Sequence, residues 1–594
     1  MAPTEPRDSP RPEHALAFDQ QLRLGYTAMD QRDFDVAWDH FQAVLDLAPG
    51  FAPAWLMLGN LALLAQDAAL ALEYYQQVRR LDPEEAGVWL SIAQARAELG
   101  QAKAVCEAYA AYLLAHPQDA EIWLRLAQAY QRIYWTRHEA DCLERYLTLR
   151  PADALSRRWL GMVRFYHGAW DWLEGYYAEQ LGSAAKSEPG VRRLLELDYL
   201  RYLFTDPQTD DAALFAWMRR CHTSEPPQWR RPIASRSSGP LRIGYLSAEF
   251  GNFASALLVW PLYLHHSQAV KVYLYDDTEP EAEARDFDFA RAIRRRINGL
   301  DDQAVADWIT ADGIDVLVDL TGITHQRRHG LYALHPAPAQ VSGLGFVFSS
   351  GLACMDYCFS DRVLCPPHIE ALYPETVIHL NSAFHWQPPE PFALTDPPLL
   401  RNRYITFGAA HTLNRLRPEV VALWARILQR VPDSRLFLKT AVLADPLTQS
   451  EFRARFAAHG IDPARLRLEG HGQDQHMPYF YPQIDIALDP FPYSGGVTTS
   501  EALFMGVPVL VMDQPQWRSR ALSVSIYTSL GLADWLTHNE DDYLNRAVGW
   551  AADPDLLCRQ RQALRPRLLN SVICDGPAYA REIEAACVRI RARA

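Results

Sequence analysis

The sequence predicts a multidomain protein in which an all-α solenoid of short helical repeats precedes two α/β domains. Two patterns indicate this order. Up to about residue 185, prolines and aromatic residues recur at a fixed period, and from residue 240 onward apolar strands alternate with amphipathic helices. The first pattern is typical of stacked helical hairpins. The second is typical of parallel sheets that helices cover on both faces.

The repeat has a period of 34 residues. A tryptophan follows each of the first three prolines by six residues, and a small residue and an aromatic one recur in the same register. Chance rarely produces this spacing in a non-repetitive helical bundle, which is the alternative. The pattern is the signature of tetratricopeptide (TPR) repeats, whose hairpins stack because none buries its apolar face alone. The positions are Pro49, Pro83, Pro117, Pro151, Trp55, Trp89, Trp123, Ala37, Ala71, Phe41, Tyr75 and Tyr109.

We predict TPR repeats over residues 18–185 and core positions for their tryptophans. The fourth repeat is weaker, because Glu139 and Leu143 replace the small and aromatic residues. Residues 1–17 contain prolines and acids but no apolar core of a signal peptide, so we expect a disordered leader. Residues 186–239 are predicted to form a helical linker that ends in a stretch rich in Pro, Ser and Arg.

Two Rossmann-like α/β domains are predicted, over residues 240–390 and 400–594, the second with terminal helices. Apolar strands bounded by glycine or polar turns support them, at 241–250, 270–276, 313–322, 404–408 and 434–440. Ligands of such sheets bind outside the carboxyl ends of the strands. The cleft between the two domains is therefore the expected active site.

The composition excludes several classes of function. A formal net charge of −14 argues against nucleic-acid binding by phosphate neutralisation. There is no run of 18 apolar residues that predicts a membrane-spanning helix. Nine cysteines in 594 residues do not indicate a disulfide framework, which favours a cytoplasmic location. Cys354, Cys358, Cys365 and His368 lack the paired spacing of structural zinc sites, so we expect structural cysteines and no metal.

The segment 484–512 carries the sharpest chemical signal. An apolar strand ends at an aspartate, and after a short turn two glycines and two threonines open a helix. Glycines let backbone approach a ligand, and the amides of a helix start suit a diphosphate. A glutamate one turn later is placed to accept hydrogen bonds from a ribose. Alternatively, the threonines only cap the helix and the glutamate pairs with a cation. These residues are Asp489, Gly495, Gly496, Thr498, Thr499 and Glu501.

This segment resembles the nucleotide-sugar site of the SPINDLY and O-GlcNAc transferase family, whose pattern is near D-I-x-L-D-T-F-P-Y-x-G-T-T-T-T-C-E. Further matches follow in the family's order and cover most of residues 240–590. The SPINDLY branch and its bacterial relatives look closer than the animal O-GlcNAc transferases. Matching stretches are PLRIGYLSAEF (240–250), GIDVLVDLTG (313–322), HPAPAQVSGLGF (335–346), VVALWARILQRVPDSRLFLK (420–439) and SVICDGPAYA (571–580).

The resemblance implies a glycosyltransferase of the GT-B fold. It would move a sugar from a UDP- or GDP-linked donor to Ser or Thr of a protein bound in the TPR groove. In the family the glycine and threonine helix start holds the diphosphate, and a lysine neutralises its charge, so no metal or other cofactor is required. Arg415 stands at the position of that lysine. Arginine keeps the charge but differs in shape.

Several residues depart from the family pattern. The family's N-N-L-A-K becomes HTLNR at 411–415, and histidines of the first domain are replaced by Phe253 and Ile323, with His325 two places further on. His476, expected to stack on the base, precedes Asp485 by nine residues rather than eight. Two explanations remain. Either transfer is retained with a re-tuned site, which we favour, or the chain is a catalytically silent TPR scaffold.

The predicted site residues have two sets of roles. Arg415 and Asp319 are predicted to be catalytic, Asp319 either as a general base or as a structural hydrogen-bonding group. Arg520 either reaches the diphosphate or pairs with an acid, and Lys439 lies in the cleft or at a solvated strand end. An acceptor that is a glycan or small molecule is a further alternative. The predicted donor-binding residues are Lys439, His476, Gly495, Gly496, Thr498, Thr499, Glu501 and Arg520.

Overall fold

A computed structural model describes residues 14–183, 189–222, 239–250, 254–279, 291–322, 328–470 and 476–593. Phe253, Ile323, His325 and most of the predicted leader lie outside these ranges. The chain falls into two compact units. One comprises Met1–Arg164 with Ala444–Thr448, and the other comprises Phe165–Leu443 with Gln449–Ala594.

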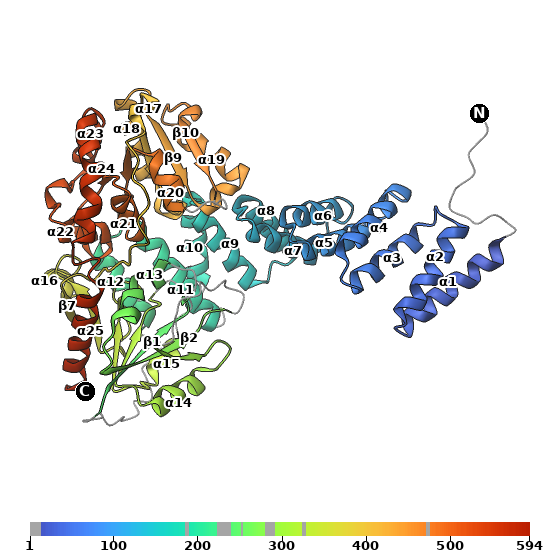
Figure 1. Cartoon of the computed structure of the whole chain (residues 1–594), viewed down its shortest axis with the longest axis horizontal. Helices are drawn as coiled ribbons and strands as arrows, with labels where there is room; N and C mark the ends of the chain where they lie inside the picture. The colour runs from blue at the N-terminus through green and yellow to red at the C-terminus, as the bar shows by residue number, and fades with distance from the viewer. Residues whose placement is uncertain are drawn as a thin grey trace. The chain divides into compact units, whose positions relative to one another are not determined.

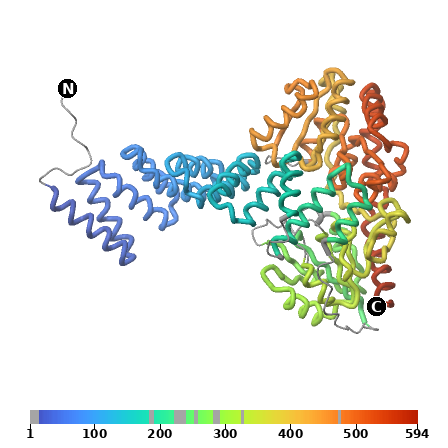
Figure 2. Tube along the Cα trace, turned by 180° about the vertical axis from the view of Figure 1, so that it is seen from behind, coloured from blue at the N-terminus to red at the C-terminus, as the bar shows by residue number. Residues whose placement is uncertain are grey.

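The first unit is a run of antiparallel helical hairpins, which follow one another in Figures 1 and 2. The second helices of the four hairpins end 34 residues apart, at Leu47, Leu81, Ala115 and Leu149. The TPR prediction is thus confirmed at the level of the fold, although α1 already begins within the predicted leader. The hairpins are α1 (Ala15–Asp30) with α2 (Phe34–Leu47), α3 (Ala52–Leu64) with α4 (Ala68–Leu81), α5 (Val88–Glu98) with α6 (Ala102–Ala115), and α7 (Ala120–Arg132) with α8 (Thr136–Leu149).

The spacing of proline and tryptophan has a direct physical cause. The indole N–H of Trp55 donates to the carbonyl of Pro49 at 2.9 Å, and that of Trp123 donates to Pro117 at 3.0 Å. The tryptophans are half-buried, and Trp55 packs against the buried core of the first repeats, so the prediction that they form the core is confirmed only in part. The small and aromatic positions do form the core. Ala37, Phe41, Ala71 and Tyr75 are fully buried.

The weak fourth repeat is stabilised in another way. Glu139, which replaces a small residue, is buried and accepts a hydrogen bond from the indole of Trp159 at 2.7 Å. Burial raises the pKa of Glu139 to about 8.

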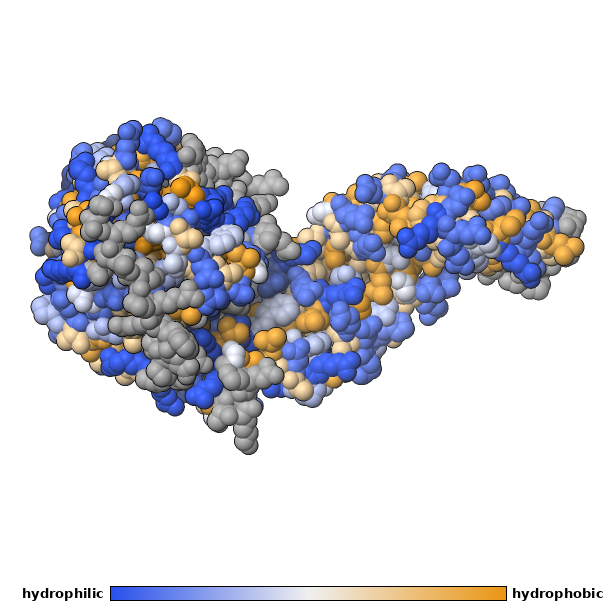
Figure 3. Space-filling view, turned by 90° about the horizontal axis from the view of Figure 1, so that it is seen from below, coloured by the Kyte–Doolittle hydropathy of each residue, from blue (hydrophilic) through white to orange (hydrophobic). Residues whose placement is uncertain are grey.

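Apolar side chains also reach the surface of the repeat helices, where orange patches interrupt the blue in Figure 3. Exposed examples are Leu24, Tyr26, Leu64, Leu99, Leu114 and Tyr134.

The second unit contains two sheets in which every paired strand is parallel, as predicted. The first has seven strands in the order β3-β2-β1-β4-β5-β6-β7, and the second has five in the order β10-β9-β8-β11-β12. The bounds of the first sheet are β1 Leu241–Ser247, β2 Val270–Asp276, β3 Ile293–Arg296, β4 Val316–Asp319, β5 Ala339–Ser342, β6 Tyr357–Asp361 and β7 Thr376–Leu380. Those of the second are β8 Thr406–Ala409, β9 Arg435–Lys439, β10 Leu466–Glu469, β11 Ile486–Leu488 and β12 Val509–Leu510.

Helices cover both sheets. In the first domain these include α13 (Ala254–His265) and α14 (Asp302–Asp312), and in the second α18 (Pro418–Arg430), α21 (Val497–Phe504), α23 (Glu540–Ala551) and α24 (Pro554–Leu569). Trp424 of α18 is fully buried in the core of the second domain.

The last helix, α25 (Gly576–Arg591), differs from the prediction. Tyr579, Ile583 and Ile590 pack into the core of the first sheet, beside Ile243 of β1. The chain therefore returns to the first domain at its end, whereas the sequence analysis assigned all of 400–594 to the second.

The predicted linker is a packed part of the second unit. Its helices are α11 (Pro189–Phe204) and α12 (Asp211–His222), which follow α10 (Trp170–Ser183). Phe204 and Phe215 pack against Phe348 of the first α/β domain. The guanidinium of Arg417, from the second domain, donates to the carbonyls of Tyr202 at 3.0 Å and Thr205 at 3.2 Å. The helices thus fix both α/β domains.

Two further predictions concern composition. Within the described ranges, none of the helices combines the length and the apolar character that crossing a bilayer requires. Cys354, Cys358 and Cys365 are buried as free thiols, while His368 is exposed. This arrangement favours structural roles for these cysteines.

Candidate active site

The topology of each sheet creates one crevice. Strand order reverses between β1 and β4 in the first sheet, and between β8 and β11 in the second. The loops that leave the carboxyl ends of two such strands diverge to opposite faces and leave a space for a ligand. In the second sheet these loops are 410–415 after β8 and 489–496 after β11, which contain most of the sequence-predicted site.

A cavity of about 370 Å³ lies at this reversal point. Arg415, Gly496, Thr498 and Arg520 of the predicted site line it. The facing wall comes from the first α/β domain and from α11. Its residues include Glu249, Gly345, Phe346, Val347, Phe384 and Phe204. The cavity therefore lies between the two α/β domains, as the sequence predicted for the active site.

Arg415 is half-buried at one side of this cavity. Its guanidinium lies 3.8 Å from the centre of the Tyr493 ring and donates to the carbonyl of Ser494 at 2.7 Å. Stacking on an aromatic ring and one backbone bond fix the plane of a guanidinium while leaving other N–H groups for an anion. The positive charge of Arg415 thus lies at the cavity where the active site was predicted.

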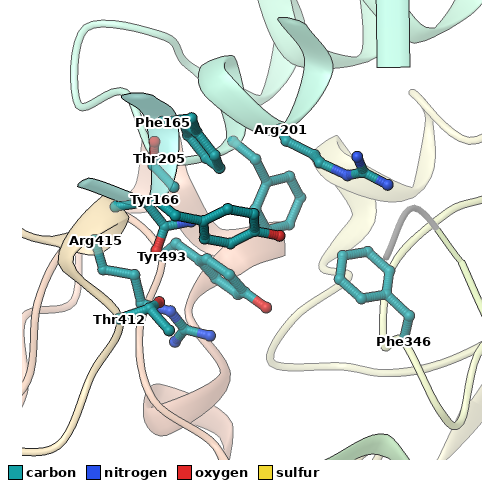
Figure 4. A pocket seen from close by; sticks show the side chains of 10 residues that line it. Phe165, Tyr166, Arg201, Thr205, Phe346, Thr412, Arg415 and Tyr493 are labelled. Carbon is teal, nitrogen blue, oxygen red and sulfur yellow. The ribbon is translucent and has the colours of Figure 1, made fainter. Parts of the chain in front are cut away.

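A smaller cavity of about 170 Å³ adjoins the first and shares Arg415, Tyr493 and Phe346 with it. Figure 4 shows the ring of Tyr493 between Tyr166 and the guanidinium of Arg415, with Phe346 on the opposite side. Arg201 of α11 also lines this cavity. Arg415 therefore stands at the junction of two spaces, one beside the glycine-rich helix start and one lined by aromatic rings.

Gly495 and Gly496 stand where a side chain would collide with neighbouring residues. A Cβ atom on Gly495 would lie 2.5 Å from the hydroxyl oxygen of Thr499 and 2.9 Å from a carboxylate oxygen of Asp489. A Cβ on Gly496 would lie 2.5 Å from Leu522. The backbone N–H of Gly495 donates to Asp489 at 2.7 Å, which sets the turn. Glycine is therefore required at both positions by the close packing of the turn on its own neighbours. The approach of this backbone to a ligand stays a prediction.

The threonines do not cap α21. The cap residue is Gly496, no side chain caps the first turn, and Thr498 and Thr499 lie inside the helix. Thr499 is buried, and its hydroxyl has no hydrogen-bond partner within the described part of the chain. The capping alternative is therefore wrong. The uncapped amides and threonine hydroxyls have the donor chemistry that a diphosphate requires.

A buried histidine connects the two loops. His411 Nδ1 lies 3.5 Å from Thr498 Oγ1, and its Nε2 lies 3.4 Å from Asp489 Oδ1. Burial, together with the nearby charge of Arg415, lowers the pKa of His411 well below its usual value. Burial raises the pKa of Asp489 to about 7, although hydrogen bonds and Arg415 act in the opposite direction. His411 departs from the family pattern, and the sequence predicted no role for it.

Glu501 lies one turn into α21, as expected. Its carboxylate accepts a hydrogen bond from the buried hydroxyl of Tyr481 at 3.0 Å. This partner is a neutral hydroxyl. Glu501 is half-buried and does not line the larger cavity among its described wall residues. A contact with the ribose stays a prediction.

Lys439 and His476 belong to a neighbouring part of the second sheet. Lys439 ends β9 and is 4% exposed, so the alternative of a solvated strand end is wrong. Its ammonium donates to the carbonyl of Gly470 at 3.0 Å and lies 3.8 Å from Glu469. His476 begins α20 (His476–Phe480), and its side chain lies outside the described part. Their donor contacts stay predictions.

Asp319 is buried at the end of β4 and accepts a hydrogen bond from the N–H of Thr321 at 3.0 Å. The hydroxyl of Thr321 in turn accepts from the N–H of Ala248 at 3.2 Å. This network closes the turns at the reversal point of the first sheet. The geometry favours the structural alternative over the general base.

Arg520 does not fit a donor-binding role. It is fully buried, and its guanidinium lies 3.6 Å from Asp211 of α12. It also donates to the carbonyls of Leu203 at 2.9 Å and Phe204 at 3.0 Å. We therefore correct its assignment to the other alternative, pairing with an acid, because its donors are used in attaching α11 and α12 to the second domain.

Sequence reasoning missed the aromatic part of the site. Tyr493 and Phe346 lie within stretches that match the family, yet nothing in their spacing distinguishes them from core aromatics. Tyr166 lies near the end of the predicted repeat region, where no site was expected. Only the fold brings these three residues together around Arg415.

Two tandem parallel α/β domains with a ligand-sized cavity between the ends of their strands define a GT-B architecture. Comparison with known proteins gives the family. The model of glycosyl transferase family 41 matches residues 219–387 and 399–583, more than half of the chain. The chain belongs to this family.

Individual relatives support the same family assignment. The chain is 33% identical over 411 residues to a probable UDP-N-acetylglucosamine–peptide N-acetylglucosaminyltransferase SPINDLY of Oryza sativa subsp. japonica. The aligned region covers 67% of this chain and 44% of that relative. The chain is 32% identical to the corresponding protein of Solanum lycopersicum, covering 66% and 43%. The chain thus spans less than half the length of these curated relatives. A solved structure, a mutant of the Thermobaculum terrenum O-GlcNAc transferase, aligns over 98% of both chains with 25% identity and a TM-score of 0.59.

Proposed function

We propose that this chain is a glycosyltransferase that moves a sugar from a nucleotide-diphosphate donor to Ser or Thr of a protein acceptor. The observation that carries the proposal is the 370 Å³ cavity in which the start of α21 and the guanidinium of Arg415 meet. The leaving diphosphate gains negative charge in the transition state. Preorganised N–H donors and a fixed cation stabilise that charge most where it develops.

The donor is placed with its diphosphate against Gly495, Gly496 and the first turn of α21. The glycines admit the phosphate oxygens, the hydroxyl of Thr498 lines the same wall, and Arg415 faces them. UDP is the first nucleotide to test because relatives of the chain are named for UDP-N-acetylglucosamine. GDP is the alternative. In this proposal the protein's own cation and amides stabilise the leaving group without a metal.

The acceptor is placed on the other side of Arg415. In a direct displacement with inversion, the nucleophile approaches the sugar from the face opposite the leaving diphosphate. The 170 Å³ cavity adjoins the donor cavity and is lined by Tyr166, Tyr493 and Phe346, so it offers a surface for a polypeptide segment. We propose that the TPR repeats bind the rest of the acceptor. The eight free cysteines in the described ranges fit the reducing cytoplasm, where we place the protein.

The direct test is nucleotide binding by titration calorimetry, with UDP and GDP in parallel. We expect binding by the wild type and at least a tenfold loss for Gly495→Ala, because the added Cβ would lie 2.5 Å from Thr499. The matched control is Gly549→Ala in α23, where a Cβ meets no atom within 4 Å. Nucleotide release from a panel of sugar donors with a protein acceptor then identifies the sugar.

The second candidate function is a catalytically silent TPR scaffold. The replacement of the family's lysine by Arg415 and of an asparagine by His411 favours it. If neither UDP nor GDP binds at millimolar concentration, the scaffold replaces the transferase. If transfer to small acceptors survives removal of residues 1–164 while transfer to proteins never occurs, the acceptor is a glycan or small molecule instead.

A further inference from the structure

A second polar cavity lies at the opposite edge of the second sheet. It has a volume of about 260 Å³ and is formed where the chain enters β8, β9 and β10. The amino ends of parallel strands share one edge, so this cavity is separated from the donor cavity by the length of the strands. Figure 1 shows α17 (Leu399–Asn402), which precedes β8, close to β9 and β10.

Four arginines line this cavity, and none of its described wall residues is acidic. This composition is unusual in a chain whose formal net charge is −14. The arginines enter from separate segments. They are Arg401 of α17, Arg435 at the start of β9, Arg465 before β10, and Arg467 within β10.

Two of these arginines form no direct ion pair. Neither Arg401 nor Arg435 makes a side-chain hydrogen bond or an ion pair within 4 Å in the described ranges, although the charge of Arg401 interacts with the carboxyl of Asp485. The guanidinium of Arg435 stacks 4.3 Å from the centre of the Tyr404 ring, which orients it without using its N–H groups. Both are exposed, so their charges are available to a ligand from solvent.

The other two arginines are fixed by neighbours. Arg465 donates through Nε to the carbonyl of Ser434 at 2.8 Å and through Nη2 to that of Leu428 at 2.7 Å. These acceptors are neutral, so Arg465 keeps its positive charge at the cavity. Arg467 pairs with Glu469 at 2.6 Å and donates to Gln483 at 2.6 Å. One charge of the four is therefore neutralised by a direct ion pair.

Other acids near the cavity do not cancel the remaining charge. Asp433 and Asp462 influence Arg465 but form no ion pair with it within 4 Å. Asp485 interacts with the charge of Arg401, but its two carboxylate oxygens already accept the N–H groups of Leu399 and Thr406 at 2.9 Å and 2.8 Å. The wall thus presents a surplus of positive charge from several directions.

We infer that this cavity binds a small phosphorylated anion. Guanidinium groups match phosphate oxygens in geometry, and groups from separate directions suit a tetrahedral dianion better than a flat carboxylate. The volume admits a phosphate monoester or a diphosphate ion but is smaller than the usual range for drug-sized ligands. This site is independent of the donor cavity and of the proposed transferase activity.

The test is calorimetric titration of the full chain with inorganic phosphate, diphosphate and glucose 6-phosphate, against acetate and succinate at matched ionic strength. Because diphosphate can also enter the donor cavity, each titration is repeated with Gly495→Ala. We expect phosphate-bearing probes to bind in both proteins. The Arg401→Gln/Arg435→Gln double variant should lose at least tenfold in affinity, because each charged hydrogen bond to phosphate is strong.

Arg426→Gln is the matched control, because Arg426 is an exposed arginine on α18 that pairs with Glu540 and Asp541. It should bind the probes like the wild type. Arg401 and Arg435 make no contact whose loss would unfold the domain, and a thermal melt of each variant verifies this. Affinity unchanged in the double variant, or equal affinity for succinate and phosphate, overturns the inference. Binding only of inorganic phosphate assigns the site to the free ion, and binding of glucose 6-phosphate assigns it to a phosphate ester.

Discussion

The reversal points of the two sheets have the same topology but opposite chemistry. In the first sheet the polar groups of the turns bond mainly to one another. Asp319 accepts from Thr321, whose hydroxyl accepts from Ala248, and the hydroxyl of Ser247 accepts from Glu249 at 2.9 Å. In the second sheet the corresponding turns leave an uncapped helix start, the buried hydroxyl of Thr499 without a described partner, and a cavity.

This difference separates stability from function along the chain. A turn whose polar groups are paired internally contributes to folding, whereas unpaired donors around a cavity cost stability and are kept where a ligand uses them. Substitutions at the second reversal point should therefore reduce binding and turnover. Substitutions at the first should reduce the free energy of unfolding.

The largest expected effect is that of Arg415→Ala. Removing one fixed cation from a leaving group costs roughly 100- to 1000-fold in turnover, by analogy with the loss of a preorganised donor. The measurement is kcat for nucleotide release, with a thermal melt to show that folding is unchanged. Arg426→Ala on the exposed face of α18 is the control, because it keeps the same charge change away from the cavity. Turnover within threefold of the wild type would exclude a catalytic role for Arg415.

A pH series on the Asp489→Asn variant tests whether the buried carboxyl at the second reversal point reduces the free energy of unfolding. The folded pKa of Asp489 is raised to about 7, from an ordinary value of about 4. The folded state therefore holds a proton that the unfolded state has lost between these values, and stability falls as pH rises from about 4 to about 7.

At about 1.4 kcal/mol for each pKa unit, the upper limit of this loss is about 4 kcal/mol. Urea unfolding at several pH values should show the wild type losing stability relative to Asp489→Asn over that range, with no further change above it. The depressed pKa of His411 acts in the opposite direction, but it is present in both proteins. A constant difference between the two proteins at all pH values would contradict the assignment.

A pair of variants at Asp319 tests the first reversal point. Asp319→Ala removes the hydrogen bond to the N–H of Thr321 in a buried turn, which should cost about 1–3 kcal/mol of unfolding free energy. Asp319→Asn keeps an acceptor oxygen and should recover most of that stability. The amide cannot act as a base. If Asp319→Asn folds normally but loses about 100-fold or more in kcat, Asp319 is the general base after all.

The sequence predicted the order of the elements better than the contacts between distant ones. The 34-residue period and the strands at 241–247 and 270–276 follow from local patterns, and the structure confirms them. β3 was not predicted, because its four residues are exposed and carry no apolar pattern. The return of α25 to the first sheet depends on packing between segments more than 300 residues apart, which no local pattern contains.

The same limit applies to the site. Gly496 and Thr498 were predicted from the glycine-rich helix start and Arg415 from the family resemblance, and all three line one cavity. Arg520 carries the same local signal, yet its partner Asp211 precedes it by 309 residues and lies in another domain element. A local sequence pattern can place a side chain at one edge of a sheet. It does not show whether an acidic residue from a distant segment already pairs with that side chain.

The smallest expected effect concerns His411, where the family pattern has asparagine. His411 connects Asp489 to Thr498 through contacts of 3.4 Å and 3.5 Å. A neutral imidazole has one donor and one acceptor nitrogen. When Asp489 is protonated it donates to Nε2, so that Nδ1–H points at Thr498 and the threonine hydroxyl is free to donate to a phosphate. When Asp489 is ionised the tautomer reverses, and Thr498 donates to the histidine instead.

Because a neutral hydrogen bond contributes about 0.5–1.5 kcal/mol, His411→Ala should weaken UDP binding by about two- to tenfold at pH 6. At pH 8 the wild type should have lost most of this advantage, and the two proteins should bind alike. His411→Asn should bind UDP with little dependence on pH, since its amide does not titrate, and the nucleotide's own titration is common to all three proteins. Parallel pH profiles for wild type and His411→Asn would show that His411 only fills space between the loops.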